Sequence, residues 1–283
     1  MAILLLMTCA AVAADAELAA GPVETVAEGF KFTEGPVWLP GEGFIFSDTP
    51  ADTIFRADKR VYRSPSGQSN GLTLDRQGRL IACEHGNRRV TRTEKDGTIT
   101  VLADTYLGRK LNSPNDVVVR SDGMILFTDP PYGVPQEDRE LEFCGVYAIT
   151  PDKQVKLLSV YFKYPNGLAL SPDEKTLYVG DSGLKFIQAF HVEEDATLSH
   201  SRFFCDADPD GMKVDVLGRL WTTDGPNVSV FTPDGTRVGE IPFPQQPANC
   251  AFGGDDSKTL FVTARTGVYQ VKTMTAGIHP SGF

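Results

Sequence analysis

One stretch decides the fold: Leu111-Asn112-Ser113-Pro114-Asn115-Asp116-Val117-Val118-Val119, continued by Arg120-Ser121-Asp122-Gly123-Met124-Ile125-Leu126-Phe127-Thr128-Asp129. Its Ser121-Asp122-Gly123 segment is a turn signal between two short apolar runs, so the stretch predicts a β-hairpin. Polar pairs stand at both open ends, Asn115-Asp116 where the first strand begins and Thr128-Asp129 where the second ends. The hairpin therefore carries polar groups to one edge of a sheet.

The same pattern of polar residue, apolar strand, turn and second apolar strand occurs six times. The polar residues that begin the units are Glu34, Asn70, Asn115, Asn166, Asp210 and Asn249. Their separations are 36, 45, 51, 44 and 39 residues, and a repeat of about 40–50 residues is typical of four-stranded propeller blades. We therefore predict an all-β fold, a six-bladed β-propeller. Residues 23–26 are expected to form the outer strand of the last blade and so to close the ring.

The six polar residues predict a ring of oxygen ligands, because the first strand of each propeller blade lines the central channel. Two carboxylates and four amides suit a hard divalent cation, and the two charges match Ca²⁺. The ring contains no His or Cys, so zinc is disfavoured, although Zn²⁺, Mg²⁺ and Mn²⁺ stay open as alternatives. A second explanation also stays open, in which these residues only form turns at the starts of strands.

Composition limits the class of function. The chain has 27 basic and 37 acidic residues, a net charge of 27 − 37 = −10, which argues against nucleic-acid binding. The unbroken repeat and the lack of a Ser/Gly or Pro-rich linker predict a single domain over residues 15–283. No protein partner is evident from the sequence.

The first 14 residues are apolar but too few to span a bilayer. They include Ala11-Val12-Ala13, an A-x-A-like cleavage site, and so predict a signal peptide over residues 1–14 and a periplasmic or secreted protein without a membrane anchor. The segment lacks Lys and Arg before its apolar run, so a cytoplasmic protein remains the alternative.

Cysteine usage permits disulfides without requiring them. Removal of Cys9 with a signal peptide would leave four cysteines, an even number, namely Cys83, Cys144, Cys205 and Cys250. Cys83 and Cys250 lie inside apolar, strand-like runs, so we expect buried free thiols.

Two loops supply candidate substrate contacts. The segment after the second hairpin, Glu84-His85-Gly86-Asn87-Arg88-Arg89, offers His85 and Arg88 to an anionic or polyhydroxylated substrate, although a lone His is more often structural. The loop Asp129-Pro130-Pro131-Tyr132-Gly133 continues to Glu140 and is long enough to form a wall of the site. It adds Asp129 and Tyr132 to the candidates. The carboxylates at the ends of second strands are otherwise expected to accept backbone N–H groups between blades.

Four motifs resemble the senescence-marker-protein/gluconolactonase/luciferin-regenerating-enzyme-like family, and the resemblance spans residues 23–271. They are Glu34-Gly35-Pro36-Val37-Trp38, Ser113-Pro114-Asn115-Asp116, Pro165-Asn166-Gly167-Leu168 and Pro209-Asp210-Gly211-Met212. Residues 83–89 and 127–133 resemble bacterial gluconolactonases in particular.

The resemblance implies a six-bladed propeller that hydrolyses sugar lactones with a divalent cation, commonly Ca²⁺, in the mouth of the channel. It implies metal ligation by Glu34, Asn166 and Asp210, with Asp210 also as the catalytic acid/base. Asn115 is implied at the metal or the substrate. Some animal members carry an arginine where this chain has Ser113, so that substrate contact is not expected here.

Three functions follow as hypotheses. The first is a metal-dependent lactonase acting on a small-molecule sugar lactone. The second uses the same metal site on phosphotriesters or arylesters, and an assay of both substrate classes separates the two. The third is a non-catalytic propeller that binds a sugar or a protein, and the absence of divalent-cation binding would favour it.

Overall fold

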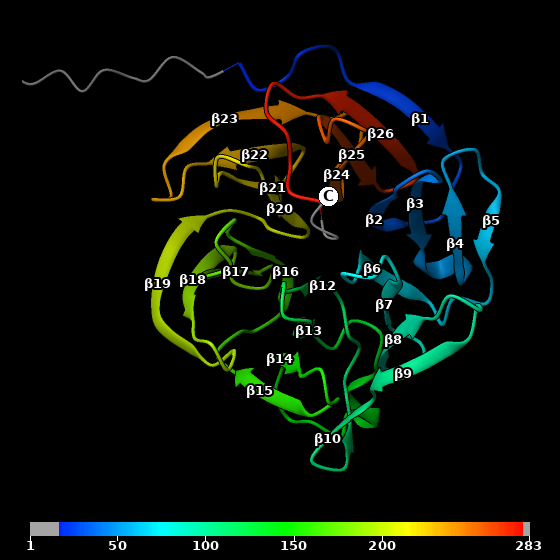
Figure 1. Ribbon diagram of the computed structural model, residues 1–283, viewed down its shortest axis with the longest axis vertical. Coiled ribbons are helices and arrows are strands. Elements are labelled where there is room, and N and C mark those ends of the chain that lie inside the picture. Colours follow the sequence, from blue (N-terminus) through cyan, green and yellow to red (C-terminus); the bar gives the residue numbers. More distant parts are fainter. Residues whose placement is uncertain (1–16, 280–283) are drawn as a thin grey trace, which may run out of the picture.

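The computed structural model describes residues 17–279, which form a ring of six four-stranded antiparallel sheets (Figure 1). The predicted all-β, six-bladed β-propeller is thereby confirmed. Over this range helical structure is limited to two 3₁₀ turns, η1 (Thr49–Ala51) and η2 (Gln136–Asp138). None of the helices there is long and apolar enough to cross a membrane. The predicted signal peptide, residues 1–14, lies outside the described residues and stays a prediction.

The first three blades each use four consecutive strands. Blade 1 consists of β2 (Thr33–Leu39), β3 (Gly43–Asp48), β4 (Thr53–Arg56) and β5 (Val61–Arg63). Blade 2 consists of β6 (Ser69–Leu74), β7 (Leu80–Glu84), β8 (Arg89–Thr93) and β9 (Ile99–Ala103). Blade 3 consists of β12 (Val117–Val119), β13 (Ile125–Asp129), β14 (Gly145–Ile149) and β15 (Val155–Ser159). A small hairpin, β10 (Thr105–Tyr106) with β11 (Arg109–Lys110), precedes blade 3.

The remaining blades follow in chain order, and the last one joins both ends of the described chain. Blade 4 consists of β16 (Pro165–Leu170), β17 (Thr176–Asp181), β18 (Phe186–Val192) and β19 (Leu198–Asp206). Blade 5 consists of β20 (Met212–Val214), β21 (Leu220–Asp224), β22 (Asn227–Phe231) and β23 (Arg237–Pro242). Blade 6 consists of β24 (Pro247–Gly253), β25 (Thr259–Ala264), β26 (Gly267–Lys272) and β1 (Glu24–Glu28).

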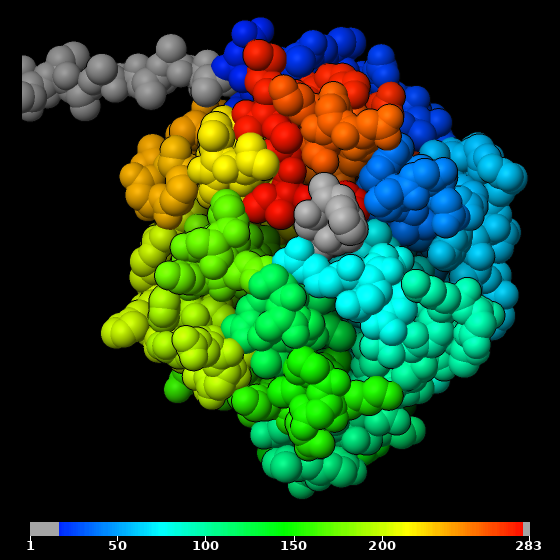
Figure 2. Space-filling view, viewed as in Figure 1, coloured from blue at the N-terminus to red at the C-terminus, as the bar shows by residue number. Residues whose placement is uncertain are grey.

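The circle of blades closes as predicted, because β1 pairs antiparallel with β26 at the outer edge of blade 6. In the space-filling view the chain colours run around the face in sequence order, so each blade borders the next (Figure 2). The strand at the N-terminal end of the described chain therefore completes the last sheet, and the ring does not depend on a separate closing element.

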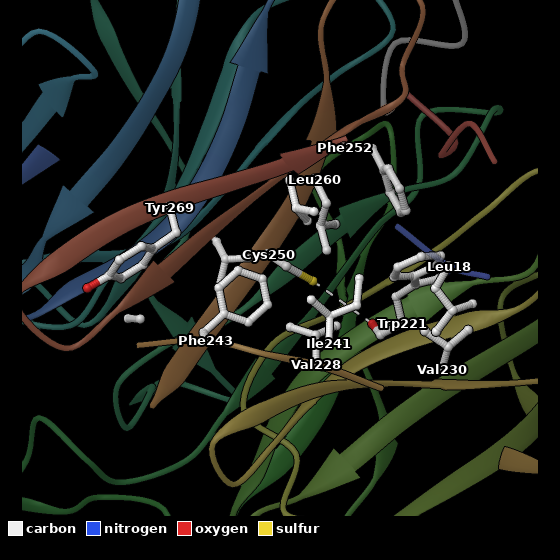
Figure 3. Packing of buried hydrophobic residues seen from close by; sticks show 13 residues of the cluster. Leu18, Trp221, Val228, Val230, Ile241, Phe243, Cys250, Phe252, Leu260 and Tyr269 are labelled. Atoms are coloured by element: carbon white, nitrogen blue, oxygen red, sulfur yellow. Dashed lines mark hydrogen bonds between the residues drawn. The ribbon is translucent and has the colours of Figure 1, made fainter. Parts of the chain in front are cut away.

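Apolar side chains fill the space between neighbouring blades. Between blades 5 and 6, Trp221, Val228 and Ile241 face Cys250 and Tyr269 in one buried cluster (Figure 3). The Cys250 thiol lies 4.0 Å from the backbone oxygen of Trp221, which it contacts as a weak donor. All four cysteines within residues 17–279 are free thiols, and three of them are buried, so the expectation of unpaired cysteines is met for this part of the chain.

We call the six polar residues that begin the repeat units the ring residues. In four of the six units a glycine follows the ring residue, and the inner strands of neighbouring blades touch at this glycine. The four glycines are Gly35, Gly71, Gly167 and Gly211. A β-carbon placed on Gly167 would lie 2.2 Å from the backbone oxygen of Asp210 in the next blade. The Gly167 N–H donates to that same oxygen at 2.6 Å, and the Gly71 N–H donates to Asn115 at 2.7 Å. Glycine is required at these positions because the backbone of the ring residue in the next blade occupies the space that a side chain would need.

The far end of the channel is crossed by the segment that follows β26. The Ile278 N–H donates to the backbone oxygen of Val214 at 3.2 Å, and the Gly277 N–H donates to that of Ser257 at 2.9 Å. The His279 ring lies 3.3 Å from the Trp38 backbone oxygen. Trp38 and Val214 stand near the ends of their inner strands, whereas the ring residues stand at the starts. The ring residues therefore face the opposite mouth.

The carboxylates at the ends of second strands hold their own blades together. They are Asp48, Glu84, Asp129, Asp181 and Asp224. Asp48 accepts the N–H groups of Lys31 and Phe32, which precede β2 of the same blade. All but Glu84 accept backbone N–H groups in this way, so the prediction of contacts between blades is wrong. A hairpin returns its second strand beside the loop that enters the first, and this places the acid next to that loop.

We predict that Gly167→Ala destabilises the protein by about 1–3 kcal/mol, the usual cost of forcing extra atoms into a packed region. The added methyl group would displace the backbone of Asp210. Gly21→Ala is the matched control, because a β-carbon there meets nothing within 4 Å and surface substitutions change stability by about 0.5 kcal/mol or less. Chemical denaturation of the two variants measures the difference. Equal stability of both variants would show that the inner strands tolerate a side chain at this junction.

A second prediction concerns pH. Burial raises the pKa of Asp129 to about 7, so the folded state holds a proton that the unfolded state releases near pH 4. The bound proton therefore favours the folded state fully below pH 4, and this contribution to the free energy of unfolding is lost as pH rises to 7. Asp129→Asn should therefore gain stability relative to the wild type between pH 5 and pH 8, by an amount on the order of 1–4 kcal/mol.

Thermal unfolding at both pH values measures this gain. Asp48→Asn is the control, because it occupies the equivalent place in blade 1 and removes a carboxylate that accepts two backbone N–H groups. A change for Asp129→Asn that is the same at pH 5 and pH 8 would contradict the prediction.

Candidate functional site

A cavity of about 340 Å³ opens at the mouth of the channel where the inner strands begin. Its lining consists of Phe32, Glu34, Thr49, Pro50, Asn70, His85, Asn115, Tyr132, Asn166, Ser182, Asp208, Pro209, Asp210, Gln246 and Pro247. Five of the six predicted ring residues are in this set. A larger hollow, of about 580 Å³, lies at the outer edge beside β23, but no ring residue contributes to it.

Asn249 is the ring residue that does not line the cavity. Its Nδ2 donates to Glu34 Oε2 at 3.3 Å, and its Oδ1 accepts the N–H of Cys250 at 2.8 Å. The same Glu34 oxygen accepts the N–H of Gly35 at 3.0 Å. Asn249 therefore lies behind Glu34 and orients its carboxylate.

Two carboxylates face the cavity without a cation beside them. Glu34 is 2% exposed, and burial raises its pKa well above the usual value, as do Asp210 and then Asp116 through charge repulsion. Burial also raises the pKa of Asp210 to about 7, and Asp116 adds to this, although Asp210 keeps part of its surface open to the cavity. Within residues 17–279 neither acid forms an ion pair.

This donor set suits a hard divalent cation. The carboxylates of Glu34 and Asp210 repel one another when both are charged, and a cation between them would remove that repulsion. The amides Asn115 and Asn166 line the same cavity and add neutral oxygens, the ligand type that Ca²⁺ prefers. In the described part of the chain no group of three or more His, Cys, Asp or Glu side chains gathers as a metal site. The fit therefore rests on two carboxylates combined with amides.

Tyr132 reaches across the cavity from blade 3 to blade 4. Its hydroxyl forms a hydrogen bond with the Ser182 hydroxyl and another with the Asn166 side chain. Its ring packs against Tyr164 at a centroid distance of 5.7 Å. Burial raises the pKa of Tyr132 to about 12, so this residue acts as a neutral hydrogen-bonding group. The loop predicted to form a wall of the site does contribute Tyr132 to the cavity.

His85 is a buried part of the wall, 7% exposed. Burial lowers the pKa of His85 to about 4, so its imidazole is neutral near pH 7. Its Nε2 and the Oδ1 of Asn70 have no hydrogen-bond partner among the described residues.

Two predicted substrate contacts lie outside the cavity. Arg88 donates from Nε to the backbone oxygen of Leu111 at 2.7 Å and from Nη1 to that of Asp138 at 3.1 Å, so it ties two loops together. Asp129 is fully buried, and its Oδ2 accepts the N–H of Asn112 at 2.8 Å. Neither side chain lines the cavity, and the hydrogen bonds of each go to backbone groups of nearby loops.

Asp116 was not predicted as a site residue, yet its charge raises the pKa of both Glu34 and Asp210. It is 1% exposed and does not line the cavity. Burial raises its own pKa, and the charge of Lys213 opposes this. The sequence does mark this residue, because Asp116 stands directly after Asn115, at the position where four of the six units have glycine.

Comparison with known proteins agrees with this architecture. The family model described as SMP-30/gluconolactonase/LRE-like region matches residues 32–266. A gluconolactonase of Zymomonas mobilis is 33% identical over 90% of this chain and 82% of its own length. A regucalcin of Bos taurus is 28% identical over 78% of this chain and 79% of its own. A solved gluconolactonase from Xanthomonas campestris is 36% identical, with a TM-score of 0.82 over 89% of each chain.

The matched region contains all six ring residues and every residue that lines the cavity. It begins at Phe32, just before the first inner strand, and ends after the last ring residue. On this evidence the chain belongs to the SMP-30/gluconolactonase/LRE-like family.

Proposed function

We propose that this protein hydrolyses a sugar lactone at the channel mouth and that the reaction depends on a divalent cation, with Ca²⁺ as the best candidate. One observation carries the proposal: the buried carboxylate of Glu34 and the half-buried carboxylate of Asp210 line one cavity with amide oxygens, and neither has an ion-pair partner among residues 17–279. The family of the chain includes gluconolactonases, and the net charge of −10 disfavours polyanionic partners.

Glu34, Asn166 and Asp210 would hold the cation, with Asn115 as a further oxygen ligand or a substrate contact. When bound, a divalent cation supplies a Lewis acid for the lactone carbonyl and the developing oxyanion. Asn249 keeps the Glu34 carboxylate in place through the bond at 3.3 Å. Tyr132 orients Asn166 through the hydrogen bond between their side chains.

Asp210 is the proposed acid/base group. A carboxylate oxygen of Asp210 accepts a proton from the attacking water, and the same group returns a proton to the ring oxygen as the ester bond breaks. The side chain of Asn166 donates a hydrogen bond to Asp210 and so fixes its orientation. Pro209 precedes it and restricts the backbone on that side, and the Gly211 N–H that follows it donates to the backbone oxygen of Ala248 at 2.8 Å.

We predict that Asp210→Asn retains measurable cation binding, because its amide still offers one oxygen, but loses about 10²-fold or more in turnover. Glu34→Gln should mainly weaken cation binding, and excess Ca²⁺ should partly restore its activity. Calorimetry with Ca²⁺ and initial rates of acid release from glucono-δ-lactone separate the two effects.

Asp208→Asn is the matched control, since Asp208 also lines the cavity but pairs with Lys185 at 3.1 Å. Its turnover should stay within about 3-fold of the wild type, as expected for an acid outside the proton path. Near-normal turnover of Asp210→Asn at saturating metal would reduce Asp210 to a ligand and leave the proton transfer to another group.

Metal removal gives a further prediction for the wild type. Treatment with EDTA should abolish lactone hydrolysis, and added Ca²⁺ should restore it, because the two acids need a cation between them. Phosphotriester and arylester substrates are assayed side by side with the lactones. Activity on those esters without activity on any lactone would favour the alternative hydrolase, and full activity in EDTA would contradict metal dependence.

A further inference from the structure

We infer that Asn70 and His85 form a subsite for substrate hydroxyl groups and that this subsite selects hydroxylated lactones over unsubstituted ones. Both residues belong to the blade 2 side of the cavity, Asn70 on β6 and His85 directly after β7. We call this pair the blade 2 wall. The inference rests on the proposed function and adds the feature of the substrate that the enzyme recognises.

The blade 2 wall holds two buried polar atoms that need a partner. Asn70 is 5% exposed and His85 is 7% exposed. The Asn70 Oδ1 and the His85 Nε2 have no hydrogen-bond partner within residues 17–279. A buried polar atom without a partner costs about 1–3 kcal/mol. Each atom has almost no accessible surface, but both side chains line the adjoining cavity, so a small rotation would bring either atom to a ligand there and a hydrogen bond would recover this free energy.

The backbone at Asn70 is fixed, and only its side-chain amide remains available. Its backbone oxygen accepts the Ser47 hydroxyl at 2.9 Å. A β-carbon on Gly35 would lie 1.8 Å from that oxygen, so blade 1 packs directly against it. The amide is therefore presented to the cavity by a rigid support, which is the arrangement expected of a specificity group.

His85 is held equally firmly. The backbone N–H of His85 donates to the backbone oxygen of Gln68 at 3.2 Å. Gly133 fits between His85 and Ser113, because a β-carbon on Gly133 would lie 3.1 Å from the His85 β-carbon and 3.2 Å from that of Ser113. The Ser113 hydroxyl donates to Pro130 and accepts from Gly133. Ser113 is thus committed to the loop, and His85 is the polar side chain that this part of the wall offers.

The charge of the cavity indicates which ligand groups fit. Its lining contains Glu34, Asp208 and Asp210 but no Lys or Arg. Burial keeps the His85 imidazole neutral, in line with its pKa of about 4. A free carbonyl oxygen such as Asn70 Oδ1 needs a donor, and a hydroxyl group supplies one, whereas a sulfonate or a fully ionised phosphate supplies only acceptors. The blade 2 wall is therefore matched to neutral, hydroxylated substrates.

Discrimination by such a wall is expected to be large, because an analogue without the hydroxyl leaves the buried atoms unpaired. We predict that His85→Phe and Asn70→Leu lower kcat/KM for glucono-δ-lactone by about 10–100-fold. For δ-valerolactone, which has the same ring without hydroxyl groups, the change should stay below about 3-fold. His85→Gln should recover part of the loss, because it restores a polar group.

Gln246→Met is the control, since Gln246 also lines the cavity but its amide already accepts from Arg265. The ratio of the two kcat/KM values should not change in this variant. Thermal unfolding of every variant shows whether the fold is kept. An equal loss on both lactones, or no loss on either, would overturn the inference and assign the two polar atoms to ordered water.

Calorimetry with glucono-δ-lactam, a ring analogue that resists hydrolysis, gives a readout that does not depend on turnover. Binding should weaken about 10-fold or more in His85→Phe and Asn70→Leu, as expected for loss of a specific hydroxyl contact. If the wild type hydrolyses neither lactone, the proposed function fails, while the lactam measurement still tests the blade 2 wall. Unchanged lactam affinity in both variants would contradict the subsite.

Discussion

The structure depends on the close contact between the start of one inner strand and the start of the next. A glycine follows the ring residue in four blades, and at Gly167 the backbone of the following ring residue, Asp210, fills the space of a side chain. The N–H of Gly167 donates to that backbone at 2.6 Å. At these four junctions the starts of neighbouring inner strands are brought together around one axis, and the polar residue before each glycine lines the channel mouth.

The same packing also brings carboxylates close together, so that they repel one another. Glu34 and Asp210 are held near each other and near Asp116 by the backbone packing of their strands, and burial raises the pKa of all three. Such an arrangement is unfavourable by itself, because like charges in a poorly solvated site repel one another. A divalent cation bound between them would remove this repulsion, so the packing that brings the acids together would also supply the affinity of the proposed metal site.

The sequence predicted the propeller and the ring because both follow from a repeat, and every repeat reports the same local structure. It could not predict that Asn249 is the ring residue outside the cavity, because this position goes with a hydrogen bond to Glu34, which is 215 residues away in the sequence. It also misplaced Arg88 and Asp129, because a strand-end position does not show that a side chain is committed to a nearby backbone. Asp116 was visible in the sequence as a departure from the glycine pattern, but its influence on both site acids depends on distances that only the fold sets.

The ring residues at the starts of the inner strands form the proposed divalent-cation site. Anomalous diffraction from a crystal of the full chain soaked in Mn²⁺, a substitute for Ca²⁺ with a stronger anomalous signal, tests this most directly. We predict one strong peak in the cavity, with oxygens of Glu34 and Asp210 among the ligands of the ion. A map without a peak there at saturating Mn²⁺, or with the ion bound elsewhere on the molecule, would contradict it.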